Sequence, residues 1–269
     1  MSILTEKMKI LKNILQSLQP GVLALSGGID STVLANFIKK WNLDFLCVFF
    51  SGPHITDFEK RWVKEIVKKT KIKYSEVEIE LLDLEPIKKN QRDRCYFCKK
   101  RMFTNLQKLY PERNIIEGSH LDDEKEYRPG SQALNELNGT SPFKLAKITK
   151  KDIREIALYE NLNPSQFPSR PCLLTRFPYD YEITKEELNK INQMETYLLI
   201  MGLRQFRIRK ESEGYFLHIE ESENKILTKN YPHILEKATK LCIKPFKMEL
   251  VKNVSGYFDK KQKGGYYGK

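Results

Sequence analysis

Long apolar runs are absent from this 269-residue sequence. No window approaches the ~18 consecutive apolar residues that a membrane-spanning helix needs, so we expect no membrane segment. Residues 1–18 alternate lysine with apolar residues and lack the continuous apolar stretch and small-residue cleavage site of a signal peptide. These absences predict a cytoplasmic protein. The hydrophobic fraction of 40% is large enough for a sizeable core and excludes a chain that is disordered throughout.

Acidic residues are fewer than basic ones. The chain has 35 Asp and Glu residues against 47 Lys and Arg residues, which gives a net charge of +12. A basic surface favours anionic partners such as nucleotides, phosphorylated substrates or nucleic acid. Lysine is also used freely along the whole chain, so charge alone does not choose among these partners.

Cysteine is scarce, and its count of five is odd. In a chain expected in the cytosol, these cysteines do not indicate a disulfide framework. Cys47 and Cys242 lie between apolar residues, which predicts two small core side chains. The other three, Cys95, Cys98 and Cys172, are candidates for chemistry.

Short apolar segments alternate with segments of helical periodicity through the first part of the chain. The expected strands are 22–25, 45–50, 73–79 and 114–117. The expected helices are 1–18, 32–40, 55–69, 95–109 and 150–160. This alternation predicts an α/β fold with a doubly wound parallel sheet covered by helices on both faces.

The pattern changes after a proline-rich stretch at 138–178. A helix at 184–201 and strands at 205–209, 215–219 and 246–251 predict a small α+β unit. We therefore place a first domain at 1–178 and a second, for substrate binding or oligomerisation, at 179–269. The tail, 260–269, consists mainly of Lys, Gly and Tyr, and we expect it to be mobile.

A polar, glycine-rich turn at 26–32 separates the first expected strand from a helix. Gly27 and Gly28 let backbone N–H groups approach a ligand closely, which predicts a phosphate site at the helix start. The turn also carries three hydroxyl groups, on Ser26, Ser31 and Thr32. Asp30 either holds Mg²⁺ beside the phosphates or caps the helix. A Walker A loop needs a Gly-Lys-Ser/Thr ending and a dinucleotide fingerprint needs three spaced glycines, so neither motif describes this turn.

Cys95 and Cys98 form a C-x-x-C pair within a strongly basic segment, 92–101, and Cys172 follows Pro171 in the proline-rich stretch. Neighbouring cations favour the thiolate form. Three unrelated thiols are one interpretation, and a zinc site is another, although zinc needs four ligands and none of the four histidines lies nearby. A [4Fe–4S] cluster held by three cysteines fits the count best. It leaves one iron open to a sulfide or a substrate sulfur.

The Ser-Gly-Gly-Ile-Asp-Ser-Thr string at 26–32 resembles the PP-loop of the N-type ATP pyrophosphatases, which cleave ATP to AMP and pyrophosphate. Two more specific strings resemble the LarE sulfur transferases within that superfamily: Pro-Cys-Leu-Leu-Thr-Arg-Phe-Pro-Tyr at 171–179 and Arg-Gln-Phe-Arg-Ile-Arg at 204–209. The resemblance spans about 24–220 and includes further strings at 94–99, 117–123 and 127–130. Where the family has a pattern nearer Gly-Thr-Asn-x-Asp-Asp, this chain has Ser119 and His120.

The resemblance implies an adenine nucleotide alpha hydrolase-like fold and a step in nickel-pincer cofactor assembly. The family adenylates a carboxylate of pyridinium-3,5-biscarboxylic acid mononucleotide with ATP and replaces an oxygen by sulfur. One branch sacrifices the cysteine sulfur at the position of Cys172. The other has the additional C-x-x-C pair and uses a three-cysteine [4Fe–4S] cluster to carry exogenous sulfide. Because all three cysteines are present, we expect the cluster branch, with ATP, Mg²⁺ and the cluster as cofactors, sulfide or another sulfur donor, and a homo-oligomer.

The resemblance also assigns roles to individual residues. It implies that Asp30 and Cys172 are catalytic, that Asp30 holds Mg²⁺, and that Gly118 and Asp123 join the nucleotide site. Cys95 and Cys98 would complete the cluster ligands.

Arg207 and Arg209 lie two residues apart on an expected strand, so both side chains belong to the same face. Paired guanidinium groups suit a phosphate, and a solvated basic strand is the alternative. The resemblance favours the phosphate of the mononucleotide substrate, with Lys99 as a third contact. Arg176, close to Cys172 in sequence, is a candidate contact for the substrate carboxylate or the AMP phosphate.

Three other functions are alternatives to this one. A PP-loop tRNA thiolation enzyme also often uses a three-cysteine cluster, and the charge of +12 favours it, but the chain has no second C-x-x-C pair for an added zinc module. An amide-forming ligase would have no use for three cysteines. A non-enzymatic nucleotide or iron–sulfur regulator would release no pyrophosphate. We therefore expect a small-molecule nucleotide substrate rather than a nucleic acid.

Overall fold

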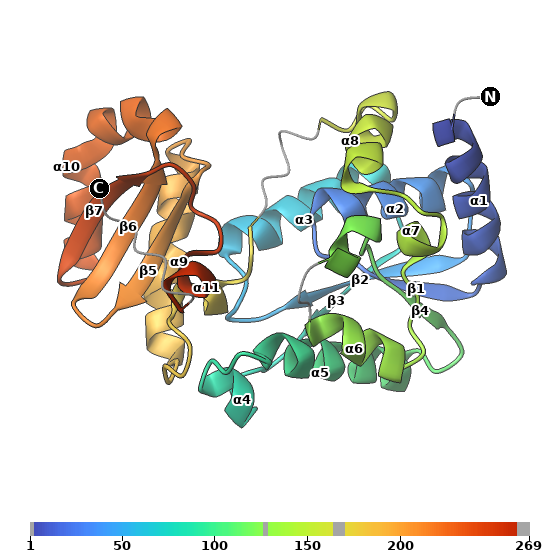
Figure 1. Cartoon of the computed structure of the whole chain (residues 1–269), viewed down its shortest axis with the longest axis horizontal. Coiled ribbons are helices and arrows are strands. Elements are labelled where there is room, and N and C mark those ends of the chain that lie inside the picture. Colours follow the sequence, from blue (N-terminus) through green and yellow to red (C-terminus); the bar gives the residue numbers. More distant parts are fainter. Residues whose placement is uncertain (1–2, 126–128, 164–169, 263–269) are drawn as a thin grey trace. The chain divides into compact units, whose positions relative to one another are not determined.

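The computed structural model describes residues 3–125, 129–163 and 170–262, which form two compact units (Figure 1). The first unit comprises Met1–Gly52, Glu59–Leu81 and Asp93–Ser169, and the second comprises Pro53–Phe58, Leu82–Arg92 and Arg170–Lys269. The chain therefore enters the second unit twice before its long final segment. The boundary expected after residue 178 lies within that final segment.

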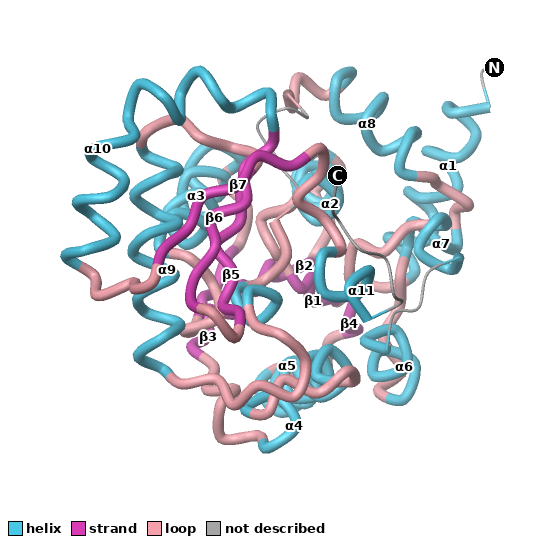
Figure 2. Tube along the Cα trace, turned by 60° about the vertical axis from the view of Figure 1, so that its left-hand side comes forward, coloured by secondary structure: helices cyan, strands magenta, loops and turns pink. Residues whose placement is uncertain are grey.

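The first unit is built on a parallel four-stranded sheet with the order β3-β2-β1-β4. Its strands are β1 (Gly21–Ala24), β2 (Phe45–Ser51), β3 (Tyr74–Glu78) and β4 (Asn114–Ile116). Its helices are α1 (Ile3–Ser17), α2 (Ile29–Lys40), most of α3 (Asp57–Thr70), α5 (Arg94–Leu109), α6 (Pro129–Glu136), α7 (Pro142–Leu145) and α8 (Lys150–Tyr159), with the 3₁₀ turn η1 (Leu121–Lys125). Helices cover both faces of the sheet (Figures 1 and 2), so the expected doubly wound α/β fold is confirmed.

The central strands are apolar on both faces because helices cover both faces. In β1, Val22 and Leu23 are fully buried, and in β2, Cys47 and Val48 are fully buried. Burial raises the pKa of the Cys47 thiol to about 12, so this cysteine is the inert core residue that the sequence predicts.

The strand order creates a topological switch point between β1 and β4. The chain leaves β1 toward β2 on one side, and β4 returns to pair on the other side of β1. In parallel sheets of this kind, ligands bind outside the carboxyl ends of the strands at such a point. The segments that follow these two ends are the glycine-rich turn after Ala24 and the segment 117–123 after Ile116.

The second unit contains a three-stranded mixed sheet with the order β5-β6-β7. Its strands are β5 (Phe206–Glu211), β6 (Gly214–Glu220) and β7 (Phe246–Val251). Strands β5 and β6 are antiparallel, and β6 and β7 are parallel. Its helical elements are α4 (Glu85–Lys88), α9 (Lys185–Ile200), α10 (Asn224–Lys240) and α11 (Tyr257–Gln262), with the 3₁₀ turns η3 (Leu173–Arg176) and η4 (Glu221–Glu223).

Alternation along β5 gives this sheet one apolar and one polar face. Phe206 and Ile208 are fully buried, while Arg207 and Arg209 belong to the opposite face. Arg207 is directly opposite His218 in the register of β5 and β6. Both faces of β5 are therefore buried, although only one of them is hydrophobic.

Short helices and one cysteine differ from the sequence-based expectations. Helices α4 and α7 span four residues each, which is too short to show a helical period. The first three residues of the expected mobile tail belong to α11, and 263–269 lie outside the described residues. The expectation that Cys242 is a core residue is wrong, because the chain turns after α10 with a φ of 54° at Cys242, and this side chain is exposed while Ile243 is buried.

No helix within the described ranges is long and apolar enough to span a bilayer.

Candidate functional site

The glycine-rich turn after β1 is held by α3. Gly27 has a φ of +77°, and a Cβ atom at this position would lie 2.6 Å from Cγ2 of Val63. Nε1 of Trp62 donates a hydrogen bond to the carbonyl oxygen of Gly27 at 3.3 Å. The backbone conformation and the close approach of α3 therefore both require glycine at residue 27.

Helix α2 begins at Ile29, three residues earlier than the sequence predicts. Gly28 is its N-cap and offers no side chain, while the hydroxyls of Ser31 and Thr32 donate to the carbonyl oxygen of Gly28 at 3.2 and 2.9 Å. Oγ of Ser26 lies 3.1 Å from Oγ of Ser31. The amides of the first turn of α2 have no acceptor within the helix, so they point outward, as an anion site requires.

Gly118 lies directly against this helix start. A Cβ atom on Gly118 would lie 3.0 Å from the backbone nitrogen of Ser31 and 3.3 Å from Cβ of Asp30. The segment after β4 and the segment after β1 therefore meet at the switch point. The structure brings together the expected nucleotide residues Ser26 to Thr32 and Gly118.

A buried carboxylate holds the segment that contains Gly118 in place. Oε1 of Glu117 accepts hydrogen bonds from the Ser119 amide at 3.1 Å and the Ser141 hydroxyl at 2.6 Å, and Oε2 pairs with Nζ of Lys99 at 3.1 Å. Burial alone would raise the pKa of Glu117, but the charge of Lys99 and these hydrogen bonds together lower it. Lys99, expected to contact the substrate phosphate, forms an ion pair with Glu117 in this structure.

Asp30 and Asp123 each have a basic partner. Both carboxylate oxygens of Asp30 contact Nζ of Lys150, at 2.5 and 2.7 Å. Asp123 is buried, accepts a hydrogen bond from the His120 amide at 3.0 Å, and has Nε2 of His120 at 3.3 Å. Asp122 accepts from the Lys150 amide at 2.8 Å.

Lys150 is the residue that sequence reasoning missed in this unit. The pattern Thr149 to Asp152 marks a helix start, and the structure has this capping box. No local sequence pattern predicts that this lysine pairs with an aspartate 120 positions away in the chain.

Cys95 and Cys98 lie in the first turns of α5, which begins at Arg94, one residue before the expected start. Residues three apart on a helix are neighbours on its surface. Cys95 is exposed, and Cys98 is half-buried. Both thiols are therefore accessible on one side of a basic helix.

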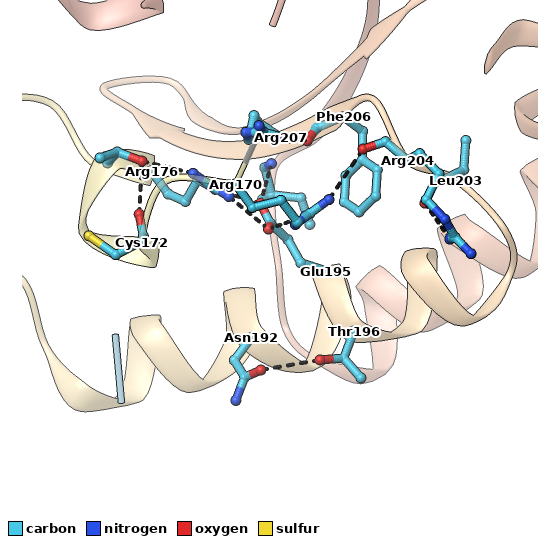
Figure 3. Close-up of polar contacts among 12 residues, drawn as sticks. Arg170, Cys172, Arg176, Asn192, Glu195, Thr196, Leu203, Arg204, Phe206 and Arg207 are labelled. Carbon is cyan, nitrogen blue, oxygen red and sulfur yellow. Dashed lines mark hydrogen bonds and ion pairs between the residues drawn. The ribbon is translucent and has the colours of Figure 1, made fainter. Parts of the chain in front are cut away.

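Cys172 precedes the 3₁₀ turn η3 in the second unit, on a loop that two arginines fix in place (Figure 3). Nε and Nη2 of Arg176 donate to the two carboxylate oxygens of Glu195 at 2.7 and 3.0 Å, and Nη2 of Arg170 donates to Oε2 at 2.9 Å. Oε1 of Glu195 also accepts from the amide of Ile208 on the edge strand β5. Glu195 therefore joins the residues on both sides of Cys172 to the sheet, while the sulfur of Cys172 points away from Glu195.

Two short segments from the first half of the chain hold the same loop. The amide of Leu173 donates to the carbonyl oxygen of His54 at 2.9 Å. Nδ2 of Asn90 donates to the carbonyl oxygens of Phe177 and Pro178 at 3.0 and 2.7 Å. The half-buried Cys172 thus belongs to a backbone with fixed partners on both sides.

Glu195 is a second residue that the sequence does not single out. It is completely buried. Burial alone would raise its pKa, but the charges of Arg176 and Arg170 and the hydrogen bonds from Arg176 lower the pKa to about 2. Arg176, a candidate contact for substrate in the sequence, pairs with Glu195 and is itself 1% exposed.

Arg207 and Arg209 share one face of β5, as expected, and both are 3% exposed. Burial, followed by the charges of Arg176 and Arg170, lowers the pKa of Arg207 to about 9. Arg209 contacts His218 and the carbonyl oxygen of Val254, and its guanidinium group stacks on Tyr257 at 4.6 Å. Four guanidinium groups, those of Arg170, Arg176, Arg207 and Arg209, therefore act on the carboxylate of Glu195, and Glu211 adds a second carboxylate beside Arg209. An added anion would relieve the repulsion among the four guanidinium groups.

The expected site residues fall into two groups. The nucleotide residues, Lys99 and the C-x-x-C pair belong to the first unit, and Cys172, Arg207 and Arg209 belong to the second. Among the residues that the structure describes, no three His, Cys, Asp or Glu side chains are gathered as a metal site.

No protein-family model matches this chain. An uncharacterized protein of Methanocaldococcus jannaschii is 35% identical over 209 residues, which cover 77% of this chain and 80% of that protein. An uncharacterized protein of a Synechocystis species is 31% identical over 212 residues, which cover 77% of this chain and 79% of that protein. The pyridinium-3,5-bisthiocarboxylic acid mononucleotide synthase of Lactiplantibacillus plantarum is 27% identical over 231 residues, which cover 82% of each chain.

Each match extends over more than three quarters of this chain and of the relative. The chain belongs to the LarE family of the PP-loop superfamily.

Proposed function

We propose that this chain is an ATP-dependent sulfur transferase. Its substrate is pyridinium-3,5-biscarboxylic acid mononucleotide, and its role is in nickel-pincer cofactor biosynthesis. The observation that carries the proposal is the meeting of Asp30, Ser31 and Gly118 at the switch point of the parallel sheet. The similarity to a pyridinium-3,5-bisthiocarboxylic acid mononucleotide synthase supports the choice of substrate.

The reaction has two steps that these residues support. A substrate carboxylate attacks the α-phosphate of ATP, pyrophosphate leaves, and an acyl-adenylate forms. A sulfur nucleophile then attacks the acyl carbon, the C–O bond to AMP breaks and a thiocarboxylate remains. The first-turn amides of α2 bind phosphate oxygens, and Asp30 holds Mg²⁺. Magnesium bound to a nucleotide needs only one or two protein carboxylates, so the donor set around Asp30 fits it.

Arg207 and Arg209 bind the phosphate of the mononucleotide in this proposal. Four guanidinium groups around Glu195 supply the excess positive charge that a phosphate dianion would balance. Lys99, which pairs with Glu117 in this structure, is the third contact.

The three accessible thiols fit an iron–sulfur cluster by their chemistry. Cys95, Cys98 and Cys172 would hold a [4Fe–4S] cluster, and the iron without a cysteine ligand would carry exogenous sulfide. Cys172 then survives turnover. The expected homo-oligomer stays a prediction.

Two measurements test this function. In the presence of the dicarboxylate mononucleotide, ATP should yield AMP and pyrophosphate, and the product should gain sulfur. Formation of ADP and phosphate would contradict the proposal, and thiolation of tRNA in place of the mononucleotide would favour the tRNA enzyme. Asp30→Ala should remove adenylation while the protein stays folded.

Anaerobic purification tests the cluster separately. The protein should contain about four irons per chain. Alanine at Cys95, Cys98 or Cys172 should remove both iron and activity, whereas Cys47→Ala and Cys242→Ala should remove neither. With sulfide supplied, the mass of the Cys172 peptide should not change during turnover, and loss of a sulfur from it after one turnover would assign the chain to the sacrificial branch.

A further inference from the structure

We propose that Lys150 is a further residue of the nucleotide site, one that binds the β- and γ-phosphates of ATP. In the nucleotide-free state Lys150 neutralises Asp30. When Mg²⁺ and ATP bind, Asp30 turns to the metal and Lys150 to the phosphates. This assignment rests on the proposed function, because it requires that the turn at 26–32 binds ATP.

The contact between the two side chains is close and accessible. Nζ of Lys150 lies 2.5 Å from Oδ1 and 2.7 Å from Oδ2 of Asp30, so one ammonium group neutralises both oxygens. The side chains keep 34% and 27% of their surface exposed. A ligand can therefore reach both groups and separate them.

The backbone of Lys150 is fixed independently of this ion pair. Lys150 is the first residue of α8, and its amide donates to Oδ2 of Asp122 at 2.8 Å. Thr149 and Asp152 cap the helix, and Asp152 also accepts a hydrogen bond from Nζ of Lys7 at 2.6 Å. Breaking the pair with Asp30 therefore leaves the lysine stem attached at the same edge of the site.

Charge balance explains why a lysine is needed here. Asp30 stands in the first turn of α2, where the amides attract phosphate but an unneutralised carboxylate repels it. Mg²⁺ neutralises Asp30 only when it is present. Lys150 holds the site neutral until then, so the nucleotide meets no net repulsion.

Lys150 also supplies an ammonium group, which no residue of the glycine-rich turn carries. A Walker A loop carries its own lysine for the β- and γ-phosphates, and residues 26–32 contain none. Lysine binds phosphate as a compact charge on a flexible stem, which suits a side chain that must exchange one partner for another. The fold brings that charge from α8 to the same helix start.

Binding measurements on the full chain separate this role from a purely structural one. The probes are AMP, and ATP with a methylene group between the α- and β-phosphates, which the enzyme cannot cleave there. Lys150→Met should weaken binding of the ATP analogue by ~10-fold or more and leave AMP binding nearly unchanged. Lys150→Arg should keep part of the affinity, and Lys151→Met, a change at the adjacent exposed lysine, should have no effect.

Each outcome decides one question. If Lys150→Met weakens the binding of both ligands equally, or leaves the binding of the ATP analogue unchanged, the assignment of Lys150 is overturned. If Lys150→Met does not fold, Lys150→Gln is measured in the same way. If the unchanged protein binds neither ligand, the proposed function fails before Lys150 is tested.

Discussion

Arg176 and Glu195 meet through two parallel hydrogen bonds, from Nε to Oε1 at 2.7 Å and from Nη2 to Oε2 at 3.0 Å. Both side chains are buried, at 1% and 0% exposure. A pair of this geometry is specific as well as strong, because the planar guanidinium group matches the carboxylate in only a few orientations. It fixes the loop that carries Cys172 with respect to α9 and β5.

Glu195→Gln should destabilise the protein and loosen this loop. Removing one partner from a buried ion pair costs about 3–5 kcal/mol, since the remaining charges are left buried. Chemical unfolding should show the loss, and the thiol of Cys172 should react faster with an alkylating reagent. The matched control is Glu186→Gln on the same helix, where an exposed pair with Lys190 is broken. An unchanged Cys172 reactivity in Glu195→Gln would show that the pair does not position the loop.

The same pair gives stability a defined pH dependence. The carboxyl of Glu195 has a pKa of about 2 in the folded state against an ordinary value of 4.5. Its contribution to stability is therefore complete above pH 4.5 and is lost as the pH falls toward 2. The unfolding free energy of the unchanged protein should decline more steeply over this window than that of Glu195→Gln. Parallel curves for the two proteins would contradict the lowered pKa.

Gly27 and Gly28 should respond differently to alanine. At Gly27 the backbone has a φ of +77° and Val63 leaves no space, so Gly27→Ala should cost about 1–3 kcal/mol of stability. Gly28 has a φ of −73°, and the nearest atom to an added Cβ, Oγ of Ser26, is 3.4 Å away, so Gly28→Ala should cost less than ~1 kcal/mol. Thermal unfolding of the two variants measures the difference, and equal losses would contradict the conformational argument.

Arg207→Ala should weaken substrate binding through the phosphate alone. A lost charge-assisted contact corresponds to ~10-fold or more in affinity. The affinity for the mononucleotide should fall, while the affinity for the same compound without its phosphate should change little. Lys210→Ala, on the opposite face of the same strand, is the control. A variant that loses both affinities equally would point to a structural role for Arg207.

The sequence predicts the parallel sheet and the glycine-rich turn because both depend on local patterns. Apolar runs such as 45–50 become buried strands, and the turn at 26–32 follows a strand and begins a helix. The partners of Asp30 and Arg176 are not local. Lys150 is 120 residues from Asp30, and Glu195 is 19 residues from Arg176, so each pairing exists only in the folded chain.

The sequence also places Arg207 and Arg209 on one face correctly, yet does not reveal their burial. Alternating arginine with Phe206 and Ile208 indicates one apolar and one polar face. A polar face is usually solvated, but here the side chains of Glu195 and Tyr257 approach it from other elements. Single-sequence patterns do not contain that information.

The hydrogen bonds that hold the loop around Cys172 determine when, during translation of the chain, this loop can take its final structure. Its backbone partners, His54 and Asn90, leave the ribosome long before Leu173 and Phe177 are made. These early segments must wait, without their final hydrogen bonds, until residues 173–178 have been translated. The thiol loop is therefore completed late, and a C-terminal fragment starting at Arg170 would lack the residues that brace it. The arginines on either side of Cys172 gain their shared partner only when Glu195 on α9 has been translated.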